Sequence, residues 1–265
     1  MATRRPFGLP LAVAFVLGAG MLAFEPPPAA AGPTASQLEA SLLTMINRAR
    51  AGRNLRPLYR DARVADLARD RASTLAAKNV LSHSAAGNLG AQLENRRIQW
   101  YMFGENLGWA TGWGSATISR LFSMWKNSSS HWRLLMSDRF NYIGVGLAYR
   151  SSSNVSYGSI VLTESIDHTR PAARMLSVSR SGSKVRWTWS AWDRRLQTRT
   201  AGLRDIDVQY RAGWGSWRTI RDNTTMTALT LTGRPSGQSY AVRVRARDRR
   251  GYLSTWTAEL RVYVP

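Results

Sequence analysis

The chain has 265 residues, 44% of them hydrophobic and 20% charged, so it can form one large packed domain or two modest ones and is not a disordered tail. It contains no cysteine, which excludes disulfide bonds and thiolate metal sites. Its formal net charge is +21, and this excess of basic over acidic residues predicts attraction to polyanions.

The first 31 residues have the composition of an export signal. Arg4 and Arg5 form a basic start, and an uncharged apolar segment, 8–24, follows. Three alanines at 29–31 offer the small residues that a signal peptidase requires. A retained membrane anchor is the alternative, but three prolines just before the small-residue site favour cleavage. We therefore expect a signal peptide over residues 1–31, no retained membrane span, and a mature protein that is secreted, extracellular or associated with the cell wall.

Three segments of the next part have apolar residues at helical spacing: 36–50, 61–79 and 115–127. In the first, Ser36 and Glu39 match a capping box. Asp61 is a typical N-cap residue for the second helix, and Ser115 for the third. We therefore expect amphipathic helices that pack on a common core.

Two segments rich in β-branched and aromatic residues follow these helices. They are NYIGVGLAY (141–149) and YGSIVLTES (157–165), separated by a serine-rich turn, and they predict a β-hairpin. Helices followed by strands predict an α+β or three-layer domain that ends near Asp167. We place this first domain at residues 36–167.

From Met175 onward the chain contains about seven short alternating segments, the number expected of an immunoglobulin-like sandwich. We place this all-β domain at residues 174–265. Alternation in SYAVRVRARD puts Val242, Val244 and Ala246 on one face and Arg243, Arg245 and Arg247 on the other. We expect the arginine face to be a solvated strand face, and the alternative is a basic stripe that faces an anionic polymer. Residues 171–265 hold 18 basic and 6 acidic residues, a net charge of +12, which gives some support to the alternative.

This second segment resembles a fibronectin type III domain. The resemblance rests on Trp189 in the second strand, on the run SYAVRVRARDRRGYLSTW, and on Tyr240 at the position of that family's buried corner tyrosine. It covers nearly the whole segment from Leu176 to Pro265. It implies a spacer or adhesive module that carries out no chemistry.

Three residues of the first domain are candidates for a site. Glu105 lies in the apolar run MFGENLGW, where a charge must be paired, hydrogen-bonded or bound. His83 and His131 each follow a predicted helix, so their side chains can converge on one cleft. Two imidazoles and a carboxylate suit zinc with one open position, or else a general acid/base pair. The third histidine, His168, lies in a predicted linker, and we assign it no role.

Five motifs occur in the order and at the intervals of the CAP superfamily, whose unit is also called the SCP domain: MINRARAGRNLRPLYRDARVADLARDRA, LSHS, GENLGW, SSHWRLLM and FNYIGVGLAY. Residues from about Leu42 to Glu164 resemble that superfamily. The resemblance implies an α-β-α sandwich whose cavity is lined by two histidines and acidic residues, and in several members this cavity binds a divalent cation. It makes His83, Glu105 and His131 the cavity residues, whether as metal ligands or as catalytic groups.

Two departures from the family pattern bear on this cavity. Many members have a second acidic residue before the second histidine, whereas residues 106–130 contain neither Asp nor Glu. Bacterial relatives often have Ser-Pro-Gly-His-Arg at that histidine, whereas this chain has Ser-Ser-His-Trp at 129–132. The departures favour a weaker site for zinc or another divalent cation, or a cavity without metal.

Three functions fit these observations. We expect first an exported protein that binds a small apolar or anionic ligand, a lipid or an envelope component in its His/Glu cavity. Its basic sandwich would adhere to anionic cell-wall or lipid components rather than to a specific nucleic acid. The alternative is a metal-dependent or His/Glu-assisted extracellular hydrolase, which we rank second because the chain has no nucleophile motif such as GxSxG. The third is a structural surface protein whose cavity has lost its function.

Overall fold

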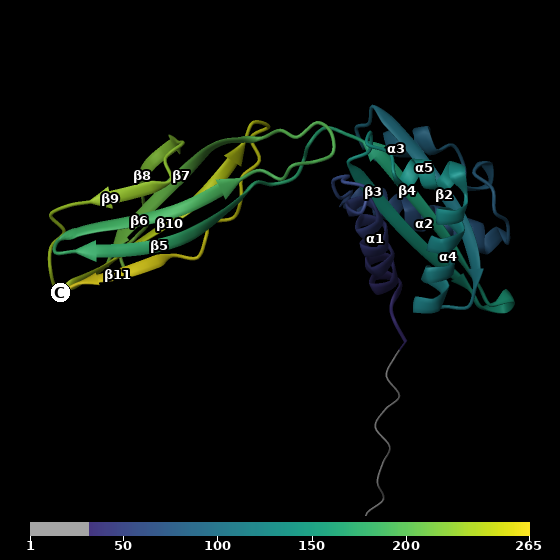
Figure 1. Cartoon of the computed structure of the whole chain (residues 1–265), viewed down its shortest axis with the longest axis horizontal. Coiled ribbons are helices and arrows are strands. Elements are labelled where there is room, and N and C mark those ends of the chain that lie inside the picture. The colour runs from purple at the N-terminus through teal and green to yellow at the C-terminus, as the bar shows by residue number, and fades with distance from the viewer. Residues whose placement is uncertain (1–31) are drawn as a thin grey trace, which may run out of the picture. The chain divides into compact units, whose positions relative to one another are not determined.

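The computed structural model describes residues 32–265, so the predicted signal peptide lies outside the described residues (Figure 1). No helix among the described residues is long and apolar enough to cross a membrane. The elements of the first part are α1 (Ala35–Ala51), β1 (Tyr59–Arg60), α2 (Ala62–Lys78), η1 (Ser84–Ala86), α3 (Leu89–Asn95), β2 (Met102–Thr111), α4 (Ser115–Asn127), α5 (Ser129–Leu135), β3 (Tyr142–Arg150), η2 (Ser151–Ser153) and β4 (Val155–Glu164).

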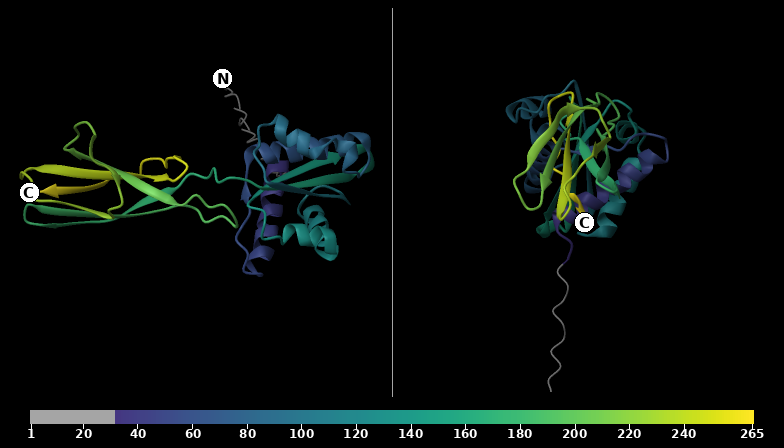
Figure 2. Two further views of the ribbon diagram at one scale, coloured as in Figure 1. Left: turned by 90° about the horizontal axis from the view of Figure 1, so that it is seen from above. Right: turned by 90° about the vertical axis from the view of Figure 1, so that its left-hand side faces the viewer.

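The first part is a three-layer α-β-α sandwich, as predicted (Figure 2). Its sheet has the order β1-β3-β4-β2, with α2 packed on one face and α1 and α4 on the other. β3 and β4 form the expected antiparallel hairpin, and β2 is an edge strand beside β4. A site on β2 is therefore reached from the edge of the sheet.

Two glycines of β3 allow α2 to lie directly on the sheet. A Cβ atom at Gly144 would lie 2.2 Å from the carbonyl oxygen of Val64, and one at Gly146 would lie 2.2 Å from the carbonyl carbon of Ala68. Both contacts are with helix backbone, which cannot yield as a flexible side chain can. The close packing fixes the position of α2 and of every side chain that α2 directs toward β2.

The first helix begins earlier than predicted. Its capping box consists of Thr34 and Gln37, not of Ser36 and Glu39. The Glu39 side chain is 4% exposed and is paired with the guanidinium of Arg69 on α2. Glu39 therefore joins two helices and does not cap its own.

The other two predicted caps differ in outcome. Asp61 caps α2 as expected, and its carboxylate accepts from the backbone N–H groups of Arg63 and Val64. In α4, by contrast, Ser115 is the first helical residue, and Gly114 occupies the N-cap position without a side-chain hydrogen bond.

The second part is a seven-stranded sandwich, as predicted. Its strands are β5 (Ala172–Ser181), β6 (Lys184–Trp192), β7 (Leu203–Ala212), β8 (Arg218–Thr224), β9 (Ala228–Leu231), β10 (Gln238–Asp248) and β11 (Leu260–Val264). They form two sheets, β11-β10-β7-β8 and β5-β6-β9. Trp187 and Trp189 are buried between the sheets, and the hydroxyl of the buried Tyr240 donates to the carbonyl of Pro235 at 2.8 Å. The predicted alternation in β10 is confirmed, since Val242, Val244 and Ala246 are fully buried.

Candidate functional site

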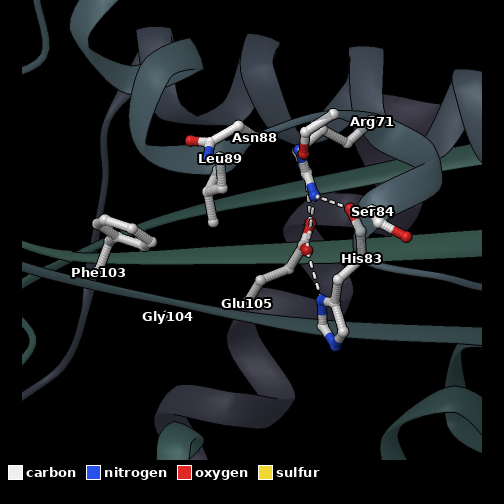
Figure 3. A pocket seen from close by; sticks show the side chains of 9 residues that line it. Arg71, His83, Ser84, Asn88, Leu89, Phe103, Gly104 and Glu105 are labelled. Atoms are coloured by element: carbon white, nitrogen blue, oxygen red, sulfur yellow. Dashed lines mark hydrogen bonds and ion pairs between the residues drawn. The ribbon is translucent and has the colours of Figure 1, made fainter.

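An open pocket with a volume of about 490 Å³ lies where α2, the loop that follows it and β2 meet (Figure 3). Its floor is charged and its rim is mixed, with apolar groups from Leu89 and Phe103. The complete lining is Arg71, His83, Ser84, Gly87, Asn88, Leu89, Phe103, Gly104 and Glu105. Two of the three predicted site residues, His83 and Glu105, thus face the same pocket.

The carboxylate of Glu105 is balanced by a guanidinium from α2. Arg71 Nε donates to Glu105 Oε1, and Arg71 Nη2 donates to Glu105 Oε2 at 2.8 Å. The two side chains are only 1% and 4% exposed. A bidentate, charge-assisted pair of this kind is strong and geometrically specific. This pair explains how a carboxylate persists in the apolar run MFGENLGW.

Arg71 also holds the loop that carries His83. Its Nη1 donates to the carbonyls of Ala86 and Gly87 at 3.2 and 3.0 Å and to Gln92 Oε1 at 2.6 Å. Its Nη2 donates to the carbonyl of His83 at 3.0 Å. One buried guanidinium therefore fixes both the carboxylate and the backbone of the pocket wall.

Arg71 was not among the predicted site residues, although a signal for it was present in the sequence. The buried face of α2 includes Val64, Leu67, Ala68 and Leu75, and Arg71 lies on that face, seven residues after Val64. A basic residue in an apolar helical stripe needs a buried partner. Read in this way, the helix itself indicates a carboxylate on the facing strand.

His83 is oriented by the same carboxylate. Its Nδ1–H donates to Glu105 Oε2 at 2.7 Å, while Ser159 Oγ donates to Oε1 at 3.1 Å. The His83 side chain is 64% exposed, so the rest of its ring remains accessible to a ligand. Glu105 thus accepts hydrogen bonds on both oxygens, and His83 is the accessible polar group of the arrangement.

His131 is not part of this arrangement. It lies on α5, its Nδ1 is hydrogen-bonded to Ser128 Oγ at 2.8 Å, and it does not line the pocket. Burial, assisted by the nearby charge of His83, lowers the pKa of His131 below its usual 6.5. Asn106 Nδ2 donates to the His131 carbonyl at 3.0 Å and so ties α5 to β2. Glu105 and His83 are hydrogen-bonded to each other, whereas His131 is hydrogen-bonded to Ser128 and lies close enough to His83 for the two charges to interact.

These residues do not fit a divalent metal ion. Within residues 32–265, no group of three or more His, Asp or Glu residues is arranged to hold one. Both oxygens of Glu105 already accept from the guanidinium of Arg71, whose positive charge lies where a cation would have to bind. The positive charge beside the carboxylate is supplied by the protein itself.

His168, for which no role was predicted, has a structural one. Its Nε2 lies 2.6 Å from Asp61 Oδ2, and its ring stacks on Tyr142 with centroids 4.0 Å apart. Burial raises the pKa of Asp61, but the hydrogen bonds from His168 and from the Val64 N–H outweigh it, and the net shift is downward. No local signal could have revealed this pair, because its members are more than a hundred residues apart.

The sequence of the first part matches a known family. Residues 43–163 match the model of the cysteine-rich secretory protein family, CAP. This part of the chain is a CAP domain. A search of curated proteins finds no match to the chain.

Solved structures resemble the CAP domain and the sandwich separately. An outer surface protein from Borrelia burgdorferi is 18% identical with a TM-score of 0.45, covering 51% of this chain and 98% of its own. An extracellular SCP-domain protein from Bacillus anthracis is 25% identical with a TM-score of 0.40, covering 50% of this chain and 45% of its own. This chain therefore spans less than half of the Bacillus protein.

The C-terminal part is a fibronectin type III-like sandwich. A similar structure is an Fn3-like protein from Clostridium thermocellum, 25% identical with a TM-score of 0.27, which covers 37% of this chain and 96% of its own. The combination of a CAP domain and a type III-like sandwich was the expected architecture.

Proposed function

We propose that the CAP domain binds a small, uncharged, hydroxyl-rich ligand, a sugar unit of the cell envelope, in the pocket beside His83. The observation that carries this proposal is the bidentate Arg71–Glu105 pair. Because the buried carboxylate is already neutralised, the pocket floor has no excess charge that would select an ion. Recognition then falls to hydrogen bonds and apolar contact.

The rim of the pocket supplies both. His83, Ser84 and Asn88 offer polar groups, and Leu89 and Phe103 offer apolar surface. A pyranose ring has hydroxyl groups at its edge and C–H groups on its faces, so it matches such a mixed wall. Pockets with a few placed polar groups and an apolar wall are typical small-molecule sites.

We further propose that the sandwich attaches the secreted protein to anionic material of the envelope. Residues 171–265 carry a net charge of +12. A surface of that charge draws polyanions toward it before any specific contact forms. Attachment by one domain would keep the pocket of the other close to envelope glycans.

Calorimetric titration of the purified protein tests the pocket. The probes are chitotriose as an uncharged glycan, glucuronate as an anion and laurate as an apolar ligand, at equal concentrations. We expect chitotriose to bind best and His83→Ala to weaken it about five- to tenfold, the effect of one lost hydrogen bond. His131→Ala is the matched control and should leave the affinity unchanged. Tighter binding of glucuronate or laurate, or equal affinity of wild type and His83→Ala, would overturn the proposal.

Hydrolysis is the second candidate function. It is favoured by the 2.7 Å hydrogen bond between His83 and Glu105, which orients the imidazole as in a general base. The hydroxyls of Ser82 and Ser84 are bonded to each other at 2.9 Å, so the attacking group would be water. Chromatography of chitotriose after incubation tests this candidate. Cleavage that is lost in His83→Ala and kept in His131→Ala would establish it.

A further inference from the structure

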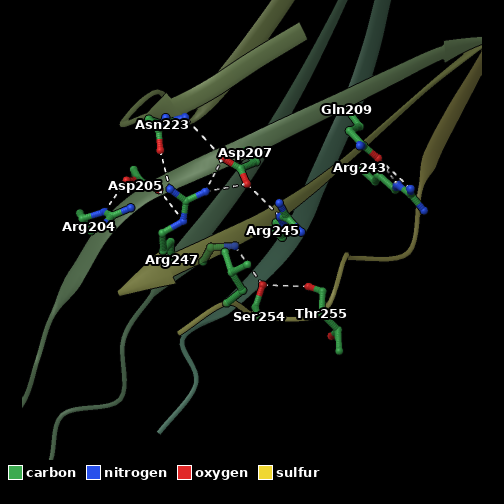
Figure 4. A network of polar contacts seen from close by, with 12 residues as sticks. Arg204, Asp205, Asp207, Gln209, Asn223, Arg243, Arg245, Arg247, Ser254 and Thr255 are labelled. Atoms are coloured by element: carbon green, nitrogen blue, oxygen red, sulfur yellow. Dashed lines mark hydrogen bonds and ion pairs between the residues drawn. The ribbon is translucent and has the colours of Figure 1, made fainter. Parts of the chain in front are cut away.

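The arginines that the sequence marked as a basic stripe are largely neutralised by neighbours (Figure 4). Arg245 Nε donates to Asp207 Oδ2 at 2.8 Å, and Arg247 Nη2 lies 3.2 Å from the same oxygen. Arg243 donates twice to the amide oxygen of Gln209, at 2.9 and 2.7 Å. Two of the three stripe arginines therefore share one carboxylate, and the third is already hydrogen-bonded.

The guanidinium faces on this sheet are also occupied. They interleave with three tryptophans: Arg261 with Trp214 at 4.0 Å, Arg211 with Trp217 at 4.5 Å, Arg243 with Trp217 at 4.3 Å and with Trp256 at 4.9 Å, and Arg245 with Trp256 at 4.7 Å. Glu259 pairs with both Arg211 and Arg261. Cation–π stacking and ion pairing stabilise this outer face and engage the guanidinium groups of these four arginines.

The opposite sheet, β5-β6-β9, has a different surface. None of the residues in its three strands is acidic. Val185, Trp187 and Trp189 of β6 point into the core, so the alternate residues of β6 point outward. The resulting outer face, here called the hydroxyl–cation face, has the exposed Trp192 at one end, and its polar residues are Arg174, Ser177, Ser179, Ser181, Lys184, Arg186, Thr188, Ser190 and Thr230.

The cations of this face have no carboxylate partners among the described residues. Arg186 contacts only the hydroxyl of Thr230, at 3.4 Å, and Arg174 and Lys184 make no ion pair. Lys184 and Arg186 lie two residues apart on β6, about 7 Å. Exposed and uncompensated cations on one flat face suit a partner that carries several negative charges along one line.

We propose that the hydroxyl–cation face binds a linear, carboxylate-bearing polysaccharide. Its arginines and lysine pair with the carboxylates, and the rows of serine and threonine hydroxyls hydrogen-bond to the sugar hydroxyls. The face has no row of aromatic side chains on which nucleic-acid bases would stack, which favours a glycan. The inference rests on the proposed adhesive role of the sandwich and assigns that role to one of its two sheets.

The test compares two triple variants of the full protein that lose the same charge. The first, Arg174→Ser/Lys184→Ser/Arg186→Ser, removes the cations of the face. The second, Arg218→Ser/Arg221→Ser/Arg250→Ser, removes three exposed arginines elsewhere in the sandwich and is the matched control. All six residues are exposed, so both variants should keep the thermal unfolding midpoint of the wild type.

Binding is measured on immobilised alginate, a linear polyuronate, at low salt, with neutral pullulan and a single-stranded oligonucleotide as comparison surfaces. We expect the face variant to lose about tenfold in affinity and the control less than about threefold. If the wild type does not bind alginate, the adhesive role itself is wrong. If the wild type binds and both variants lose affinity equally, net charge alone accounts for binding, and the proposed role of the hydroxyl–cation face is refuted. If the oligonucleotide binds more tightly than alginate through the face, the partner is not a glycan.

Discussion

Replacement of Arg71 by methionine tests the central feature of the CAP pocket. Methionine fills a similar length but leaves the Glu105 carboxylate 4% exposed with only His83 and Ser159 as donors. It also leaves the carbonyls of Ala86 and Gly87 without the donor they now share. Removal of one partner from a buried ion pair typically destabilises a protein by about 3–5 kcal/mol, and we expect Arg71→Met to fall in that range.

Denaturant-induced unfolding at neutral pH provides the assay, with Arg96→Met as the matched control. Arg96 pairs with Asp70 at 2.6 Å, but these side chains are 32% and 67% exposed. Water screens such a pair, so the control should lose about 1 kcal/mol or less. Comparison of the two variants separates the effect of burial from the loss of an arginine as such.

A double variant completes the test. Arg71→Met/Glu105→Leu removes both charges, so it should be more stable than Arg71→Met alone. The interaction free energy between the two positions should be about 1–3 kcal/mol. If Arg71→Met costs no more than Arg96→Met, or if the double variant is simply the sum of its parts, the carboxylate does not depend on this guanidinium. The account of the pocket as internally neutralised would then be wrong.

Four further outcomes are expected. Because the cation of the pocket is Arg71, EDTA should leave the calorimetric affinity for chitotriose unchanged, and a loss would show that a bound metal contributes. Gly146→Ala should lower the free energy of unfolding by about 1–3 kcal/mol in a denaturant titration, because the added Cβ would lie 2.2 Å from helix backbone. Gly52→Ala is the control and should be nearly neutral, because the nearest atom to its added Cβ is 3.5 Å away. The pKa of His131 is lower in the folded state than in the unfolded state, so the protein loses stability as the pH falls below about 6.5. His131→Gln should reduce that loss, measured as the difference between thermal scans at about pH 5.5 and 7.5. Trp256→Leu removes two guanidinium contacts and should destabilise the sandwich by about 1–2 kcal/mol in the same scans, with no effect on alginate affinity.

Periodicity predicted the main helices and strands of both domains, whereas the α-β-α layering of the first was implied by the family resemblance. The apolar stripe of α2 and the alternation of β10 each have a single buried face, and the structure buries that face. The capping box of α1 was misplaced for a physical reason. A glutamate three residues after a serine satisfies the pattern locally, but Glu39 gains more from Arg69, thirty residues away, than from its own helix end. Local patterns cannot weigh a partner from another element.

The same limit explains the outcome at the site. Motif order placed Glu105 and His83 together, and they are hydrogen-bonded. It also placed His131 near them, and that ring is hydrogen-bonded to Ser128 at the start of α5 while the charge of His83 still acts on it. Arg71 was overlooked because it was treated as one more residue of a basic chain. Its position on the buried face of α2 indicated a buried carboxylate partner, whereas its residue type alone did not.

Net charge is therefore a poor guide to where this protein meets a partner. Its arginines fall into three physical classes: a buried counter-ion such as Arg71, stacked and paired groups such as Arg245, and exposed groups without carboxylates such as Arg186. Only the third class projects an uncompensated field into solvent. The sequence pointed to the arginines of β10 because they alternate with apolar residues, yet alternation shows only that they face outward. Which outward-facing charges remain available depends on the carboxylates and indoles that the fold brings beside them, and within residues 32–265 the cations of the β5-β6-β9 face have neither beside them.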